Sequence, residues 1–181
     1  MTLKIQDNIF RQYDIRGLYG TELSDEFAEA LGRGYAAFLR SHTTATEQKK
    51  LKVSIGMDAR TSSEPLKAAL IKGLIESGID CVDIGYCPTP LQYFSLHAFD
   101  LDGGLMITGS HNPSEYNGFK ISVGKGTIHG DEIQELKDVI KETLKSSIAM
   151  ATAKGEIEKI DIIKEYTEYH VERFAQTIPQ K

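Results

Sequence analysis

Strand-like and helix-like segments alternate along most of the chain, and this alternation restricts the possible folds more than any other feature. Four segments have the apolar and β-branched composition of strands: 51–57, 79–85, 103–109 and 117–124. Four others are expected to be helices from their apolar spacing and end signals: 24–39, 65–78, 91–99 and 131–146. Strands and helices that alternate through short loops form sheets covered by helices. The sequence therefore predicts an α/β fold, a layered domain with a mixed, largely parallel sheet flanked by helices.

Polar loops follow three of the predicted strands, and one of them has an unusual composition. The three are DARTSS at 58–63, YCPTP at 86–90 and GSHNPSEYNG at 109–118. In such sheets ligands bind outside the carboxyl ends of the strands. The third loop places Ser110, His111 and Asn112 side by side before a proline. A turn needs the glycine, asparagine and proline, but it does not need the serine or the histidine, so we expect a functional site here.

Two reactions suit a serine at this place. Ser110 next to His111 suggests a hydrolase, but adjacent residues on an extended loop usually point apart, and the base must reach the nucleophile. The loop also lacks the G-x-S-x-G signature of an α/β-hydrolase. Phosphoryl transfer to the serine is favoured instead, and it requires cations near the loop. Lys120, Arg16 and Arg60 could supply them, although FRQYDIRG at 10–17 could also be an edge strand with exposed arginines.

Five motifs together resemble a known enzyme family. FRQYDIRG, IGMDAR, PTP, TGSHNP and YNGFK occur in the order and approximate spacing of the α-D-phosphohexomutase family. The chain is most similar to its bacterial phosphomannomutase/phosphoglucomutase branch, and TGSHNP followed by YNGFK is the most specific part of the match. The resemblance covers roughly Phe10 to Ser146, which corresponds to the first of that family's four domains and implies its fold.

The resemblance implies a role for each residue of the serine loop. Ser110 resembles the catalytic serine that is phosphorylated in the active enzyme. His111 would be a catalytic neighbour that handles a proton or contacts phosphate. Asn112 would shape the loop and help to bind substrate. Through its phosphate, Ser110 would also be a ligand of the Mg²⁺ cofactor, whose remaining carboxylate ligands belong to a family loop that does not occur in this sequence.

The resemblance also implies roles for residues outside the loop. Lys120 and Arg16 would be catalytic and substrate-binding cations that contact the transferred phosphate. Tyr13 would be a substrate-binding aromatic near the sugar. Asp58 and Arg60 resemble the family's GRDxR loop, which supports the serine loop. Here that loop reads GMDAR, so it departs from the pattern at one position but keeps the charged pair.

The implied activity is an intramolecular phosphotransfer between hexose 6-phosphate and hexose 1-phosphate through a 1,6-bisphosphate. The loops that in the family bind metal, select the sugar and bind the distal phosphate do not occur in this sequence. We therefore expect residues 1–154 to be an N-terminal phosphoserine domain and 155–181 to be a linker and the truncated start of a second domain. Such a fragment would be inactive by itself. A free-standing phosphosugar-binding or regulatory module without turnover is the alternative.

Composition excludes some classes of partner. The formal net charge of -5 argues against nucleic-acid binding, and no apolar stretch is long enough to cross a membrane. The expected partners are hexose phosphates and the remaining domains of the enzyme. Cys81 and Cys87 match no redox or zinc spacing, so we expect buried thiols and a cytoplasmic protein. VGKGTIHG at 123–130 lacks the features of a phosphate loop and predicts a hairpin or connecting loop.

Overall fold

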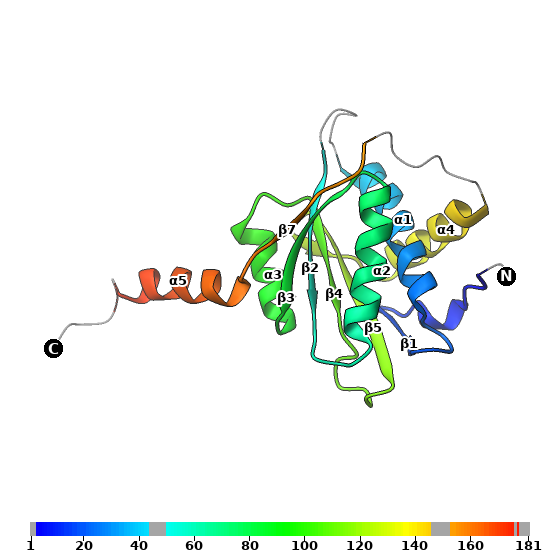
Figure 1. The fold of residues 1–181 in the computed structure, drawn as a ribbon, viewed down its shortest axis with the longest axis horizontal. Helices are drawn as coiled ribbons and strands as arrows, with labels where there is room; N and C mark the ends of the chain where they lie inside the picture. Colours follow the sequence, from blue (N-terminus) through cyan, green and yellow to red (C-terminus); the bar gives the residue numbers. More distant parts are fainter. Residues whose placement is uncertain (1–2, 44–49, 146–152, 176, 178–181) are drawn as a thin grey trace.

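A mixed sheet forms the centre of the protein in the computed structural model, which describes residues 3–43, 50–145, 153–175 and 177. Over these residues the strand order is β1-β5-β4-β2-β3-β7, with β6 paired to β5. The strands are β1 (Ile15–Leu18), β2 (Lys52–Met57), β3 (Asp80–Tyr86), β4 (Gly103–Ile107), β5 (Tyr116–Val123), β6 (Gly126–Thr127) and β7 (Ile157–Lys159). The central strand β2 runs parallel to both β3 and β4, whereas β5 is antiparallel to β4 and β1 (Figure 1). The predicted α/β class is confirmed.

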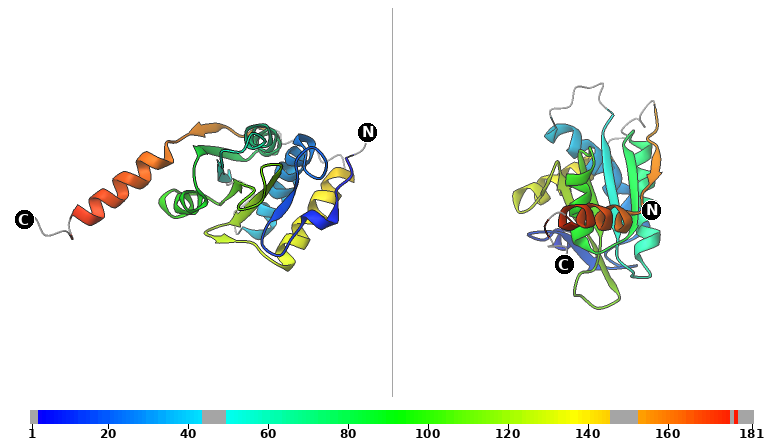
Figure 2. Two further views of the ribbon diagram at one scale, coloured as in Figure 1. Left: turned by 90° about the horizontal axis from the view of Figure 1, so that it is seen from below. Right: turned by 90° about the vertical axis from the view of Figure 1, so that its left-hand side faces the viewer.

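Helices cover both faces of this sheet. The elements are a short 3-10 turn η1 (Asp7–Ile9), α1 (Asp25–His42), α2 (Ser63–Glu76), α3 (Thr89–Ala98), α4 (Asp131–Lys145) and α5 (Ile162–Ala175). Helices α1, α2 and α4 lie on one side of the sheet and α3 on the other (Figure 2). Ser24 caps α1, because its hydroxyl accepts the N–H of Phe27 at 3.2 Å. Of the hairpin or connecting loop expected at 123–130, the structure shows the hairpin, with Val123 opposite Gly126.

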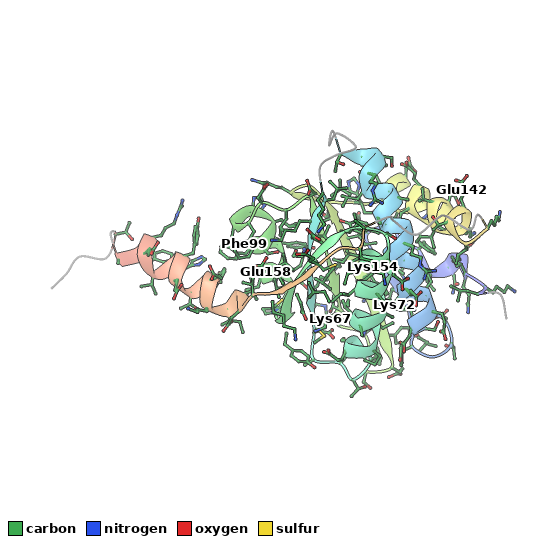
Figure 3. The ribbon with its side chains drawn as sticks, turned by 45° about the horizontal axis from the view of Figure 1, so that its top comes forward. Lys67, Lys72, Phe99, Glu142, Lys154 and Glu158 are labelled. Atoms are coloured by element: carbon green, nitrogen blue, oxygen red, sulfur yellow. The ribbon has the colours of Figure 1, made fainter. Side chains whose placement is uncertain are left out.

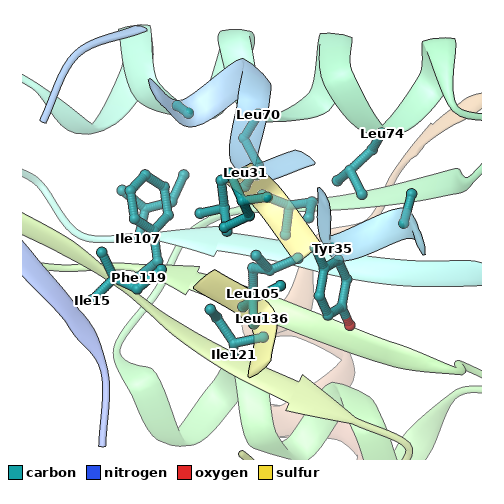
Figure 4. Close-up of a cluster of buried hydrophobic side chains, with 14 of the residues drawn as sticks. Ile15, Leu31, Tyr35, Leu70, Leu74, Leu105, Ile107, Phe119, Ile121 and Leu136 are labelled. Carbon is teal, nitrogen blue, oxygen red and sulfur yellow. The ribbon is translucent and has the colours of Figure 1, made fainter. Parts of the chain in front are cut away.

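The larger core lies between the sheet and helices α1, α2 and α4. Its central side chains are Leu31 and Tyr35 of α1, Leu70 and Leu74 of α2 and Phe119 of β5, all fully buried (Figure 4). The hydroxyl of Tyr35 remains satisfied because it donates to the carbonyl of Ser122 at 2.5 Å. Since burial of apolar surface is the main favourable term in folding, this layer provides most of the rigidity on which the loops at the sheet edge depend.

A smaller core lies under α3 and contains one of the two cysteines. Val82, Ile84, Met106 and Cys87 belong to this cluster. Both cysteines are free thiols and buried, which confirms the sequence prediction. Burial raises the pKa of Cys81 to about 12 and that of Cys87 to about 11, so both thiols are protonated and unreactive near neutral pH.

The C-terminal segment contains one short strand, β7, and one helix, α5. β7 extends the sheet by pairing in parallel with β3. Its Glu158, labelled in Figure 3, forms a 2.7 Å ion pair with Lys52. Helix α5 then leads away from the sheet (Figure 1) and contacts α3 through edge-on packing of Tyr166 against Phe94. Large apolar side chains of α5 remain exposed, including Val171 at 62% and Phe174 at 56%. The expected domain boundary near residue 154 stays a prediction.

The close contact between α1 and α2 depends on Gly73, and a larger residue there should destabilise the fold. A Cβ atom on Gly73 would lie 2.2 Å from the carbonyl oxygen of Glu29, so an alanine there must push the helices apart. We expect Gly73→Ala to lower the free energy of unfolding by about 1–3 kcal/mol in urea denaturation. Helix propensity alone predicts that Gly73→Ala raises the free energy of unfolding, because alanine favours the helix more than glycine does. Ala68→Gly, at an exposed position of the same helix, measures that propensity term, and a stabilised Gly73→Ala protein would contradict the prediction.

Candidate active site

The serine loop connects β4 to β5 and presents Ser110 at the surface. Ser110 has a φ of 53° and is the only residue other than glycine with positive φ in the part of the chain that the structure describes. Its N–H donates to Thr108 Oγ1 at 2.9 Å, which holds this costly backbone conformation. The Ser110 hydroxyl lies 3.1 Å from His111 Nδ1. The expectation that the two side chains point apart was therefore wrong, because Ser110 is left-handed rather than extended.

Arg60 holds the backbone of this loop from the side of β2. Its guanidinium donates to carbonyl oxygens of Ser110 at 3.1 Å, Asn112 at 2.7 Å, Pro113 at 2.5 Å and Tyr116 at 3.0 Å. Only 14% of the Arg60 side chain is exposed. The planar fork of donors suits several acceptors at once, and each bond is charge-assisted. One side chain therefore determines the path of the loop from residue 110 to residue 116.

Asp58 orients Arg60 and binds the loop directly. Asp58 Oδ2 accepts from Arg60 Nε and from the Gly109 N–H, both at 3.1 Å, and Oδ1 accepts from Ser63 Oγ at 2.7 Å. Burial alone would raise the pKa of Asp58, but hydrogen bonds from Ser63, Thr108 and the backbone outweigh it and lower the pKa. Gly109 has to be glycine, because a Cβ there would lie 2.3 Å from Arg60 Cζ. The carboxylate therefore stays ionised and holds both the arginine and the loop.

A second cationic cluster lies at the base of the same loop. Arg16 is 6% exposed, and its Nη1 donates to the Gly109 carbonyl at 2.7 Å. Its Nη2 pairs with Asp14, and Lys120 Nζ lies 3.5 Å from the same carboxylate. Arg16 lies on the edge strand β1 opposite Gly118, so the edge-strand interpretation is correct but the arginine is not exposed. Asp14 therefore holds two cations beside the loop.

The predicted site residues lie in three groups. Asp58 and Arg60 bind the serine loop on one side, and Arg16 binds it at its base, where Asp14 links it to Lys120. Tyr13 is 67% exposed and lines a surface cavity together with Gln12, His129 and Gln134. Both arginines donate to backbone carbonyls, which was not expected for Arg16.

Sequence reasoning missed four residues that contribute to this arrangement: Asp14, Ser63, Thr108 and Asn117. Asp14 had a usable signal, since it is a carboxylate within FRQYDIRG, between an aromatic residue and an arginine. Asn117 lies in the YNGFK motif but received no role. The other two carry small hydroxyl side chains, and their importance depends on contacts with residues far away in the chain.

Two negative findings concern the described ranges alone. Within residues 3–43, 50–145 and 153–175, no cluster of three or more His, Cys, Asp or Glu side chains could hold a metal ion. Among the same residues, no helix combines the length and apolar character that crossing a membrane requires.

Comparison with known proteins identifies the family. Residues 7–147 match the family model described as phosphoglucomutase/phosphomannomutase, alpha/beta/alpha domain I. The chain belongs to this family. It is 38% identical over 162 residues to a phosphomannomutase/phosphoglucomutase of Pseudomonas putida, covering 90% of this chain and 33% of the relative. A phosphomannomutase of Vibrio cholerae is 39% identical over 165 residues, covering 88% of this chain and 34% of that relative.

A solved structure agrees with this assignment. A phosphoglucomutase/phosphomannomutase family protein from Burkholderia thailandensis superimposes with a TM-score of 0.80 at 35% identity, over 93% of this chain and 36% of that one. The expected family is thus confirmed by sequence and by structure. The chain spans about a third of the length of the curated relatives it matches.

The lowered pKa of Asp58 predicts how stability depends on pH in this family member. A carboxylate with a pKa below its ordinary value of 3.8 stabilises the folded state above that value, and this contribution is lost as pH falls through the folded-state pKa. We expect Asp58→Asn to lower the free energy of unfolding at pH 7 and to reduce the loss of stability that wild type shows on acidification below pH about 4. Urea denaturation between pH 7 and pH 3 measures both effects. Asp100→Asn, at an exposed loop position, is the control, and an equal acid response in both variants would contradict the prediction.

Proposed function

We propose that Ser110 is the phosphoryl carrier of a hexose-phosphate mutase that interconverts hexose 6-phosphate and hexose 1-phosphate through a 1,6-bisphosphate. The observation that carries this proposal is the exposed Ser110 hydroxyl on a loop whose backbone is bound by two arginines. A hydrolytic loop needs a reactive serine but not this set of cations. Phosphoryl transfer depends mainly on positioning and charge neutralisation, which such a loop favours.

The chemistry follows from the atoms that surround the hydroxyl. In the loading step Ser110 Oγ forms a bond to phosphorus while the bond from phosphorus to a sugar oxygen breaks. His111 Nδ1, 3.1 Å from Oγ, would accept the serine proton, and the leaving sugar oxygen would take up a proton from this histidine or from water to become a hydroxyl. In the working cycle the phosphoserine gives its group to the free hydroxyl of a hexose monophosphate. The bisphosphate then reorients and returns its other phosphate to Ser110.

The cations have different proposed tasks. Arg60 and Arg16 hold the loop, because their donors bind its carbonyl oxygens. Among the described residues the amine of Lys120 has a single long contact, 3.5 Å to Asp14, and 24% of the side chain is exposed, so Lys120 is the better candidate to bind the transferred phosphate. Tyr13 would contact the sugar from the exposed loop before β1. Asn112 would keep the loop open to substrate through its carbonyl bond to Arg60.

The cofactor and the remaining domains are also proposals. Mg²⁺ bound to a phosphoserine oxygen would neutralise charge on the phosphoryl group. The described residues offer no ligand cluster for it, so its other ligands would come from elsewhere in the enzyme. We assign residues 1–154 to the phosphoserine domain and 155–181 to a linker and the start of a second domain. The relatives, named for glucose and mannose, support hexose phosphates as substrates. The buried free thiols support a cytoplasmic location.

Phosphorylation of Ser110 can be tested directly. The purified chain is incubated with glucose 1,6-bisphosphate and Mg²⁺, and the phosphorylated peptide is identified by mass spectrometry. We expect a phosphate adduct on Ser110 in wild type and in Ser114→Ala, which removes an exposed serine of the same loop, but none in Ser110→Ala. An adduct that maps to another residue, or that persists in Ser110→Ala, would contradict the assignment.

A second test concerns the chain without further domains. We expect it to show no measurable turnover of glucose 1-phosphate or mannose 1-phosphate in a coupled assay with Mg²⁺. The reason is that metal, sugar and distal-phosphate loops expected from the family are missing from this sequence. A full-length family member is the positive control. Turnover near the rate of that control would refute the fragment hypothesis, and phosphosugar binding without phosphorylation of Ser110 would favour a binding module.

A further inference from the structure

Asn117 is a fully buried residue of β5, and its side-chain amide is hydrogen bonded at both ends. The Nδ2 group donates to Ser62 Oγ at 2.8 Å and to Ser63 Oγ at 3.0 Å, at the beginning of α2. The Oδ1 atom accepts the N–H of Gly118 at 2.9 Å. The same strand carries Lys120 three residues later. Asn117 therefore joins the strand of the phosphate-binding lysine to the start of the helix that follows the Asp58 loop.

The hydroxyl of Ser63 extends this connection to the serine loop. Ser63 Oγ donates to Asp58 Oδ1 at 2.7 Å. A hydroxyl has a single proton, so a Ser63 that donates to Asp58 must accept from Asn117. Asp58 Oδ2 in turn accepts the N–H of Gly109, the residue before Ser110. Three consecutive hydrogen bonds thus lead from Asn117 to the backbone of the loop.

Burial alone does not distinguish Asn117 from other buried amides. Gln92 of α3 is also fully buried and also donates to a serine hydroxyl, that of Ser54, at 3.3 Å. Ser54 in turn accepts from Ser95 of α3, so this cluster ties α3 to β2 in the interior of the domain. The difference is the Ser63 link, through which the Asn117 amide acts on a carboxylate that contacts the active-site loop.

We propose that Asn117 is a positioning residue for phosphoryl transfer at Ser110. By donating to Ser63 it directs the serine proton toward Asp58, and the oriented carboxylate then holds the Gly109 N–H and Arg60. Without the amide donor, the Ser63 hydroxyl is free to rotate and Asp58 loses a fixed donor. The catalytic consequence rests on the proposed function of Ser110, whereas the hydrogen-bond chain does not.

The test measures amide hydrogen exchange at Gly109 relative to Leu105, a fully buried residue of the central strand β4. We expect Asn117→Ala and Ser63→Ala to raise this ratio about tenfold, the factor given by about 1.4 kcal/mol. Ser62→Ala removes the other acceptor of Asn117, which has no bond to Asp58, and should leave the ratio unchanged. Gln92→Ala controls for the general loss of a buried amide and should also leave it unchanged. The double variant Asn117→Ala/Ser63→Ala should resemble Ser63→Ala.

Positioning of the serine loop by Asn117 and a general loss of protein stability predict different exchange ratios. An equal ratio in Asn117→Ala and Gln92→Ala, or a change in Asn117→Ala that Ser63→Ala does not reproduce, would overturn the proposal. If Asn117→Ala does not fold, Asn117→Asp preserves the size and removes the donor, and it should give the same increase. The variants in which the exchange ratio rises should also show slower labelling of Ser110 by glucose 1,6-bisphosphate. Absence of labelling in wild type would refute the carrier role of Ser110, while the exchange ratio still decides the role of Asn117.

Discussion

The hydrogen bonds of Asp58 and Arg60 to the backbone of the serine loop are the interactions on which the rest of the site depends. A loop between two strands leaves backbone carbonyls without ladder partners, and such acceptors need donors from elsewhere. Arg60 supplies donors to four of them, and Asp58 fixes the arginine and the Gly109 N–H. Lysine could not replace this planar arrangement, because its ammonium is a point charge without a fork of donors. The hydroxyl of Ser110 can thus be exposed while the backbone that carries it is held.

The sheet topology explains why these residues meet. β4 lies next to β2 in parallel register, so the loops after both strands emerge at one edge of the sheet. β5 returns antiparallel to β4 and carries Lys120 back toward the interior, and β1 adds Arg16 on the far side. Charged side chains from three segments, namely the loop after β2, β5 and β1 with the residues before it, therefore converge on one loop. The arrangement needs no long flexible connection, and that favours a loop that is held in place before any ligand binds.

Local patterns predicted much of the fold and part of the site. The helices expected at 24–39 and 65–78 and the hairpin or connecting loop expected at 123–130 were predicted, because each depends on residues close together in the chain. The serine loop was found for the same reason, since its unusual residues are adjacent. β7 was missed because a strand of three exposed residues has no apolar period and exists only through its pairing with β3. The contact between Ser110 and His111 was missed because it follows from one left-handed residue.

The sequence by itself determined the class of fold, the location of the loop that bears Ser110 and the set of cations available to it. Only the tertiary structure decided what those cations do. Arg16 reaches a carbonyl 93 positions away, and Asn117 reaches Ser62 across 55 positions. Such partners are chosen by the register of the strands and by the close approach that Gly109 allows, and neither leaves a periodic trace in the sequence. The physical reason is that a hydrogen bond depends on distance and direction in space, whereas apolar spacing and turn residues act through neighbours along the chain.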